Sequence, residues 1–345
     1  MNPISIRLLS QQLCAPQFSK PEDVVRHFGA MQGQEYRLMR WAVAMRTKKP
    51  SAKAFQKAYD SGKIIRLHLL RGTWQLVATE DYHWLLDLFA DKARRVIQGW
   101  MSANNISIPD DEYAQIRAIL LQCASDKGSA TKEDFVNAMA EHHIVMDDHR
   151  LSYHIRMAEL AGVLCSGDLH PAKMTYALAE TKVPQTEPFE RDEALTRLAR
   201  KYFQSHSPAT LEDFVWWSGL GIIECRKAIA LLGTEILSDK WKKKKFYLHS
   251  SARTRGFRKG DVLLLPPYDE YLIGYKSRDI ALDETLRHKA HNNMGTFFPV
   301  IAHDGIISGN WKPFEKRLMV ELFDGSDITP EIEAEWTKYQ QYRNR

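Results

Sequence analysis

The clearest pattern of apolar and polar positions along the chain is a repeated helix start. Residues 130–136 (Ala-Thr-Lys-Glu-Asp-Phe-Val) recur almost unchanged as residues 209–215 (Ala-Thr-Leu-Glu-Asp-Phe-Val). In both copies a Thr stands three positions before an Asp, just ahead of an apolar run. The Thr oxygen can accept from the free N–H groups of a helix start, and the acids suit its positive end. A weaker third copy spans residues 20–25, where Pro21 suits the first helical turn.

Each strong copy lies within the same succession of predicted elements. A helix precedes it, a second helix that ends at a Gly follows it, and a two-stranded hairpin closes the unit. These elements occupy residues 113–123, 151–162 and 163–178 in one unit, and residues 192–206, 224–232 and 235–248 in the other. Helices followed by a hairpin in this order are typical of a winged helix.

The rest of the sequence predicts a linker and a domain that is richer in short strands. Residues 181–190 are polar and contain Pro, as in a linker, whereas short strands and turns predominate beyond residue 260. The predicted fold class is α+β: three tandem winged-helix units, then a small C-terminal β-barrel or sheet with a closing helix over residues 330–345. The predicted domains are residues 1–100, 101–180, 190–258 and 259–345.

Charge changes this picture only locally. The 48 Lys and Arg against 43 Asp and Glu give a net charge of +5, which permits nucleic-acid binding without requiring it. The densest basic stretch is Lys242, Lys243, Lys244 and Lys245, followed by Arg253 and Arg255. The Lys run falls at the tip of the third predicted hairpin, where it either contacts DNA phosphates or keeps the tip solvated.

Composition also narrows the classes of protein. No run of apolar residues is long enough to span a membrane, and the first residues lack the layout of a secretory signal, so we expect a cytoplasmic protein. The four Cys lie far apart, and the spacing of the His residues fits no standard ligand pattern. We therefore expect no metal site.

Four stretches resemble one bacterial family, the winged-helix DNA glycosylases typified by AlkZ and YcaQ. Residues 31–35 (Met-Gln-Gly-Gln-Glu) resemble its catalytic motif of two polar residues around one small or aliphatic residue. Residues 71–77 resemble its Arg-Gly-Thr segment. Residues 207–220 and 265–275 are long, specific matches. The sequence departs from the family pattern at Gly33, usually a bulkier aliphatic, and at Gln75, often a His.

The resemblance implies both a fold and an activity. It implies three winged helices arranged around duplex DNA, and hydrolysis of the N-glycosidic bond of alkylated bases (N7- or N3-alkylpurines) or crosslinked bases without a cofactor. We expect a monofunctional DNA glycosylase, because no Lys lies in a recognisable nucleophile setting. We also expect a monomer that binds double-stranded DNA.

The resemblance assigns the chemistry to Gln32 and Gln34. Two side-chain amides spaced i, i+2 on a loop or strand can face the same side and fix a water molecule. Taken alone, the same residues are two ordinary polar positions after a helix.

Other residues are predicted to support this site or to bind DNA. Arg71 and Thr73 either contact a phosphate or support Gln34, and Gln75 lies beside them in sequence. Asp269 and Glu270 either pair with Arg278 or bind the first unit and so hold the catalytic face.

Two other functions remain open at this point. A non-catalytic winged-helix DNA-binding protein or transcriptional regulator is the main alternative, because winged helices are commonest in that role. A protein-binding scaffold is the other, and a basic hairpin tip weighs against it.

Overall fold

The computed structural model describes residues 2–315 and 317–344. Packing divides the chain into two compact units. Residues 1–55 and 195–345 form the terminal unit, and residues 56–194 form the middle unit. The boundaries of the four predicted domains stay a prediction.

The middle unit is mainly helical, with three short antiparallel pairings among its described strands. Its elements are β2 (Ile64–His68), η1 (Leu70–Gly72), β3 (Trp74–Ala78), η2 (Thr79–Asp81), α5 (Tyr82–Ala103), α6 (Asp110–Lys127), β4 (Ala130–Thr131), α7 (Lys132–Glu141), α8 (Asp148–Leu160), β5 (Leu164–Ser166), β6 (Thr175–Leu178) and α9 (Ala179–Lys182). β6 pairs with both β4 and β5, and β2 pairs with β3. The core of α6, α7 and α8 includes Leu120, Phe135 and Ile155. The predicted order of helices and hairpin in this part of the chain is confirmed, and α9 takes up the first residues of the predicted linker.

The terminal unit combines helices with two further sheets. Its elements are α1 (Pro3–Ser10), α2 (Pro21–Phe28), β1 (Met31–Gln32), α3 (Met39–Ala44), α10 (Arg191–His206), α11 (Leu211–Ser218), α12 (Ile222–Leu231), η3 (Gly233–Glu235), β7 (Ile236–Trp241), β8 (Lys244–His249), β9 (Val262–Leu265), α13 (Glu270–Ile273), η4 (Glu284–Leu286), α14 (Arg287–Ala290), β10 (Val300–His303), β11 (Ile306–Phe314), β12 (Arg317–Leu322) and α15 (Pro330–Asn344). α4 (Ala52–Asp60) and the first turn of α10 cross the boundary between the units.

Both predicted helix caps form as the sequence pattern indicated. The side chain of Thr131 accepts from the N–H of Asp134, and the carboxylate of Asp134 accepts from the N–H of Thr131. Thr210 and Asp213 make the same reciprocal pair at the start of α11. These caps satisfy N–H groups that a helix start leaves free, and the capping-box prediction is confirmed.

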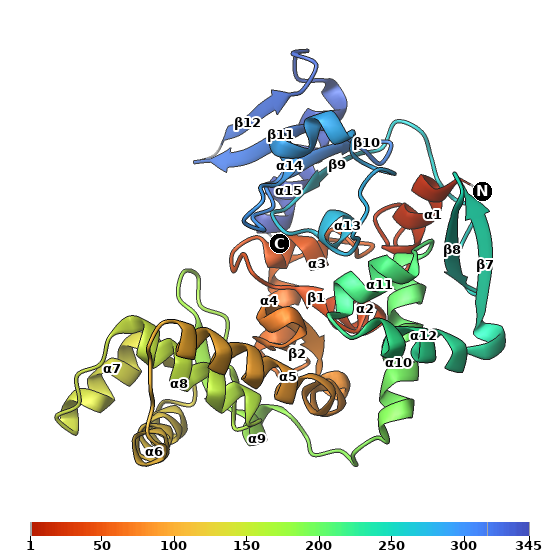
Figure 1. Cartoon of the computed structure of the whole chain (residues 1–345). Coiled ribbons are helices and arrows are strands. Elements are labelled where there is room, and N and C mark those ends of the chain that lie inside the picture. Colours follow the sequence, from red (N-terminus) through yellow and green to blue (C-terminus); the bar gives the residue numbers. More distant parts are fainter. Residues whose placement is uncertain (1, 316, 345) are drawn as a thin grey trace. The chain divides into compact units, whose positions relative to one another are not determined.

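The C-terminal strands form an open sheet and not a closed barrel. Its strand order is β12-β11-β10-β9, so among the described residues β12 and β9 are edges. Helix α15 packs against β9 (Figure 1). Trp311 is buried in the core of this unit and donates its Nε1–H to the carbonyl of Leu265 at 2.8 Å. Of the two predicted forms, the sheet is therefore the one observed.

No helix in the described part of the chain is both long and apolar enough to cross a membrane.

Candidate active site

The two amides of the predicted catalytic pair lie in different environments. Gln32 ends β1 and is buried, and its side-chain oxygen accepts from the N–H of Gly33 at 3.1 Å. Gln34 lies in the loop that follows and is exposed. The Gln34 side chain makes no hydrogen bond to the described residues, so its amide is available to a water molecule or a ligand.

Glu270 holds the backbone of Gln32, the residue at which this loop begins. Its Oε1 accepts from the backbone N–H of Gln32 at 2.6 Å, and its Oε2 accepts from Nε1–H of Trp217 at 3.2 Å. The carboxylate is almost completely buried, so these contacts replace water as its hydrogen-bond partners. A buried charged acceptor that serves several elements at once holds them in one arrangement.

His206 completes the surroundings of the same carboxylate. Its Nε2 lies 3.2 Å from Oε2 of Glu270, and its Nδ1 lies 2.8 Å from Oγ of Ser205. Burial lowers the pKa of His206, and the adjacent Glu270 opposes this effect. The ring stacks on Tyr202 with centroids 4.5 Å apart, which fixes its plane.

Gly274 is required here because two groups approach its Cα closely. A Cβ at this position would lie 2.6 Å from the carbonyl oxygen of Glu270 and 2.6 Å from Nε2 of His206. Both distances are shorter than any normal contact. A side chain at Gly274 would therefore displace the Glu270 backbone or the His206 imidazole.

Asp269 forms a separate buried ion pair with Arg46. The guanidinium donates to both carboxylate oxygens, at 2.7 and 2.9 Å, and both side chains are almost fully buried. Asp269 also caps α13 by accepting from the N–H of Tyr271. Bidentate geometry of this kind is what a buried ion pair needs.

Of the two sequence alternatives for the adjacent acids, the observed contacts are with the first 100 residues. Asp269 binds Arg46, and Glu270 binds the backbone of Gln32. Arg278 instead donates to the carbonyls of Leu272 and Lys276, and it stacks over aromatic rings. Local sequence reasoning could not choose Arg46, because 223 positions separate it from Asp269.

The Arg-Gly-Thr segment forms the tip of the β2–β3 hairpin in the middle unit. Arg71 has a left-handed backbone with φ of 56°. Its side chain lines a pocket of about 300 Å³ with Trp100, Tyr153 and Arg156. None of the described residues that line this pocket is acidic, so it favours anionic groups.

Gln75 supports the same hairpin from inside. It is buried, and its Nε2–H donates to Oγ1 of Thr73 at 2.8 Å, while Thr73 donates to the carbonyl of Leu70. These bonds hold the turn and leave the Arg71 side chain at its surface.

The Lys run lies at the tip of the β7–β8 hairpin, as its position predicted. Lys242 and Lys243 form the turn with positive φ, and Lys244 and Lys245 begin β8. All four are exposed. Lys244 pairs with Asp279 at 2.8 Å, so it is tied to the terminal unit while the turn lysines extend beyond.

Arg253 and Arg255 differ from each other in setting. Arg253 donates to the backbone carbonyls of Cys14 and Ala15, so its guanidinium is engaged in holding the chain. Arg255 is exposed. Arg255 is accordingly the more accessible of the two to a nucleic acid.

Sequence reasoning missed the groups that position the Gln32 strand. His206, Trp217, Arg46 and Gln11 were not singled out. Gln11 donates to the backbone carbonyl of Glu270 and accepts from Arg46. His206 precedes the specific stretch of residues 207–220 and Trp217 lies within it, which was the available signal. Within the described residues no group of three His, Cys, Asp or Glu is placed to hold a metal ion.

Comparison with known proteins identifies the class. A family model described as DNA glycosylase AlkZ-like matches residues 25–341. The chain is 25% identical to a Streptomyces sahachiroi protein named "Interstrand DNA cross-link repair glycosylase", over 89% of this chain and 86% of that protein. The solved structure of Streptomyces sahachiroi DNA glycosylase AlkZ matches with a TM-score of 0.77 at 21% identity, over 99% of this chain and 95% of that one.

The protein is a DNA glycosylase. More particularly, the chain belongs to the AlkZ-like DNA glycosylase family, which confirms the resemblance found in the sequence.

Proposed function

We propose that the protein hydrolyses the N-glycosidic bond of cationic alkylated purines and of bases crosslinked through such positions, using a water molecule placed by Gln32 and Gln34. The observation that carries this proposal is the anchored loop: the Gln32 backbone is fixed by buried Glu270, and the Gln34 amide beside it is exposed and unengaged. The name of the Streptomyces sahachiroi relative supports crosslinked DNA as a substrate.

The proposed chemistry follows from the lesion. An N7- or N3-alkylated purine carries a positive charge, so its base departs without a strong general acid. The enzyme then has to place a water molecule on the sugar and accommodate positive charge as it develops there. An amide carbonyl accepts a hydrogen bond from water and orients it without removing its proton. Such a site suits labile cationic bases and not neutral ones.

The division of labour between the two amides follows from their burial. Gln34 contacts the water, and buried Gln32 fixes the position and direction of the loop. Arg71 and Thr73 contribute a DNA-phosphate contact through the hairpin tip, and the turn lysines contribute another. His206 and Trp217 act as positioning residues through Glu270.

The helix-helix-helix-hairpin succession supports a winged-helix fold for the DNA-binding units. In this proposal residues 1–100, 101–180 and 190–258 are winged helices, and residues 259–345 form the C-terminal sheet domain with its helix. A monomer with three such units would clasp one duplex without a palindromic site.

The test is base release from a duplex that carries a single N7-methylguanine. We expect release by the wild-type protein, a loss of at least about tenfold in Gln34→Ala, and no release of uracil from a matched duplex. A second substrate is a duplex crosslinked through N7 of guanine, and its unhooking is followed on a denaturing gel. Equal release of uracil would contradict the proposal, and so would full activity of Gln34→Ala.

A further inference from the structure

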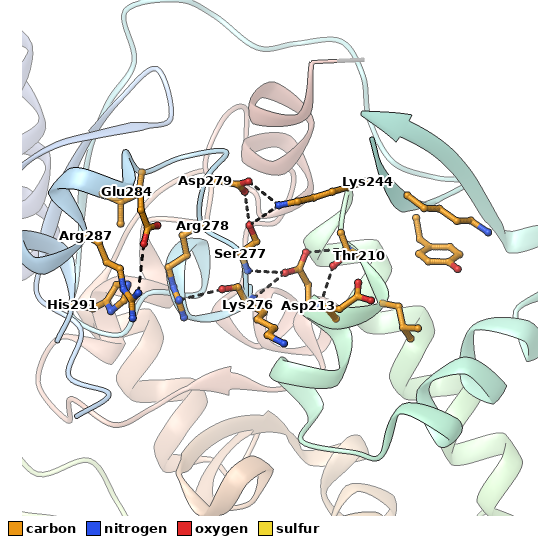
Figure 2. Close-up of a pocket in the computed structure, with 15 residues that line it drawn as sticks. Thr210, Asp213, Lys244, Lys276, Ser277, Arg278, Asp279, Glu284, Arg287 and His291 are labelled. Atoms are coloured by element: carbon orange, nitrogen blue, oxygen red, sulfur yellow. Dashed lines mark hydrogen bonds and ion pairs between the residues drawn. The ribbon is translucent and has the colours of Figure 1, made fainter. Parts of the chain in front are cut away.

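A second feature of the terminal unit is a pocket that the proposed chemistry does not use. It has a volume of about 770 Å³ and is formed by the start of α11, the start of β8 and residues 276–291. Figure 2 shows its charged lining, with Lys244 reaching toward Asp279 and the Lys276 and Ser277 backbone held by Asp213.

The pocket is lined by charges of both signs, and its two buried or paired acids differ from Lys276 in how they are engaged. Asp213 accepts from the backbone N–H groups of Thr210, Lys276 and Ser277 and lies 3.7 Å from buried Arg7. Asp279 is paired with Lys244. Lys276, by contrast, is exposed, and its ammonium has no partner among the described residues.

Arg287 adds a second accessible cation. Its contacts with Glu284, at 3.5 Å, and with the Asn293 side chain, at 3.4 Å, are long. The guanidinium is about half exposed. Exposed contacts of this length are weak and can be exchanged for a better anion.

His291 lines this pocket and has a buried ring nitrogen that the described residues leave unpaired. Only 5% of its surface is exposed, and its buried Nε2 has no hydrogen-bond partner in the described part of the chain. The ring stacks on Phe297, and its Nδ1 lies 3.5 Å from the carbonyl of Asn292. Buried polar atoms in folded proteins are almost always paired, so an unpaired one in the wall of a pocket points to a ligand.

Helix α11 contacts both the pocket and the residues that hold the Gln32 loop. Asp213 in the first turn of α11 holds residues 276 and 277 at the pocket, and Trp217 in its last turn holds Glu270. Four residues of helix span roughly 6 Å. One helix therefore contacts both the pocket and the carboxylate that holds the Gln32 backbone.

We infer that this pocket binds a backbone phosphate of DNA, with Lys276 and Arg287 supplying the charge and His291 a hydrogen bond. A phosphodiester offers two unesterified oxygens, one for the cations and one for the imidazole. This inference rests on DNA binding alone and not on the roles proposed for the two glutamines.

The first test measures binding of an undamaged duplex by the full-length protein as salt is varied. We expect the Lys276→Gln/Arg287→Gln double variant to bind more weakly at low salt and to lose about one unit of the log–log salt slope, the amount for one phosphate contact. Lys312→Gln, at an exposed position of β11 outside this pocket, is the control and keeps the wild-type slope. Circular dichroism checks that each variant is folded. An unchanged slope in the double variant overturns the inference.

The second test places the contact on the DNA. Single phosphates are replaced one at a time by neutral methylphosphonates, and wild type is compared with the double variant. We expect one position at which the methylphosphonate weakens wild-type binding but has no further effect on the variant. Additive losses at every position overturn the inference.

Two further measurements isolate the source of the phosphate and the part of His291. Inorganic phosphate that binds the wild type while no methylphosphonate position couples would mean a site for free phosphate, and this result overturns the DNA assignment. His291→Phe keeps the stack on Phe297 and removes the nitrogens. We expect it to abolish the hydrogen-bond contribution at the same methylphosphonate position, and unaltered sensitivity there would remove His291 from the site.

Discussion

The backbone N–H of Gln32 donates to Oε1 of Glu270 at 2.6 Å, although 238 positions separate the two residues. The same carboxylate accepts from Trp217 and faces His206. One buried acid therefore joins β1, the end of α10, α11 and α13. The hydrogen bond between Gln32 and Glu270 fixes the position of the loop that carries Gln34.

Replacing Glu270 by Gln tests that dependence. The amide keeps the size of the side chain but turns one acceptor into a donor, which then faces the N–H of either Gln32 or Trp217. We expect base release from N7-methylguanine DNA under single-turnover conditions to fall about 10- to 100-fold, because a small displacement of a positioning group has effects of this size.

The measurement separates a positioning role from general damage. Duplex affinity of Glu270→Gln should stay within about threefold of wild type while the release rate falls. Glu333→Gln, at an exposed position of α15, should leave both unchanged. Equal losses of affinity and rate would show that Glu270 only maintains the fold.

Gly274→Ala should disturb the same network from a different side. The added Cβ would meet the Glu270 carbonyl and the His206 ring, each at 2.6 Å. We expect a loss of roughly 1–3 kcal/mol in the free energy of unfolding, as for overpacking of a well-packed core, and slower base release. Urea unfolding gives the first quantity.

Gly99→Ala is the matched control for that substitution. Gly99 lies inside α5, and a Cβ there would meet nothing within 4 Å. Ala favours a helix interior by about 1 kcal/mol over Gly. The two substitutions should thus change the free energy of unfolding in opposite directions. A neutral or stabilising Gly274→Ala would show that the backbone around Gly274 has room for a methyl group.

The buried pair of Arg46 and Asp269 makes a prediction about stability. Asp269→Asn keeps the cap on α13 but leaves the Arg46 guanidinium uncompensated in the interior. We expect a loss of about 3–5 kcal/mol for this variant and for Arg46→Met. The double variant should be less destabilised than the sum of the two, because it leaves no lone buried charge. Chemical denaturation of all four proteins measures the coupling, and additive losses would contradict the pairing.

The sequence predicted those parts of the fold whose signals are local. Thr131 with Asp134 and Thr210 with Asp213 are three residues apart, so a capping box can be recognised without knowing the fold. The position of the Lys run at a hairpin tip follows from strand patterns on either side of it. Whether the last strands close into a barrel depends on strand tilt and stagger, which local patterns do not encode.

The candidate site was predictable only as far as its motifs extend. The Gln32 and Gln34 pair is a short motif that gained weight from the family resemblance. Its anchor Glu270 lies 238 positions from Gln32, and a contact over such a separation depends on packing of the whole terminal unit. For this reason sequence reasoning gave Asp269 and Glu270 two alternative partners and could not choose between them.

A final prediction concerns pH and His27. The ring packs between Phe18 and Phe28, and its Nε2 lies 2.8 Å from the carbonyl of Ser10. Burial lowers the pKa of His27 to about 4, with a smaller contribution from the nearby Lys201 and His206. The unfolded chain therefore binds a proton on this residue at a higher pH than the folded protein does.

The sign of the effect follows from this difference. The contribution of His27 to stability is fully present above about pH 6.5 and is lost as the pH falls toward 4, by at most about 3 kcal/mol. His27→Gln keeps a donor for the Ser10 carbonyl but does not titrate, so its free energy of unfolding should fall less steeply over this range. His303→Gln, at an exposed position, should follow the wild-type curve. Parallel curves for wild type and His27→Gln would mean that His27 is as accessible to protons in the folded protein as in the unfolded chain.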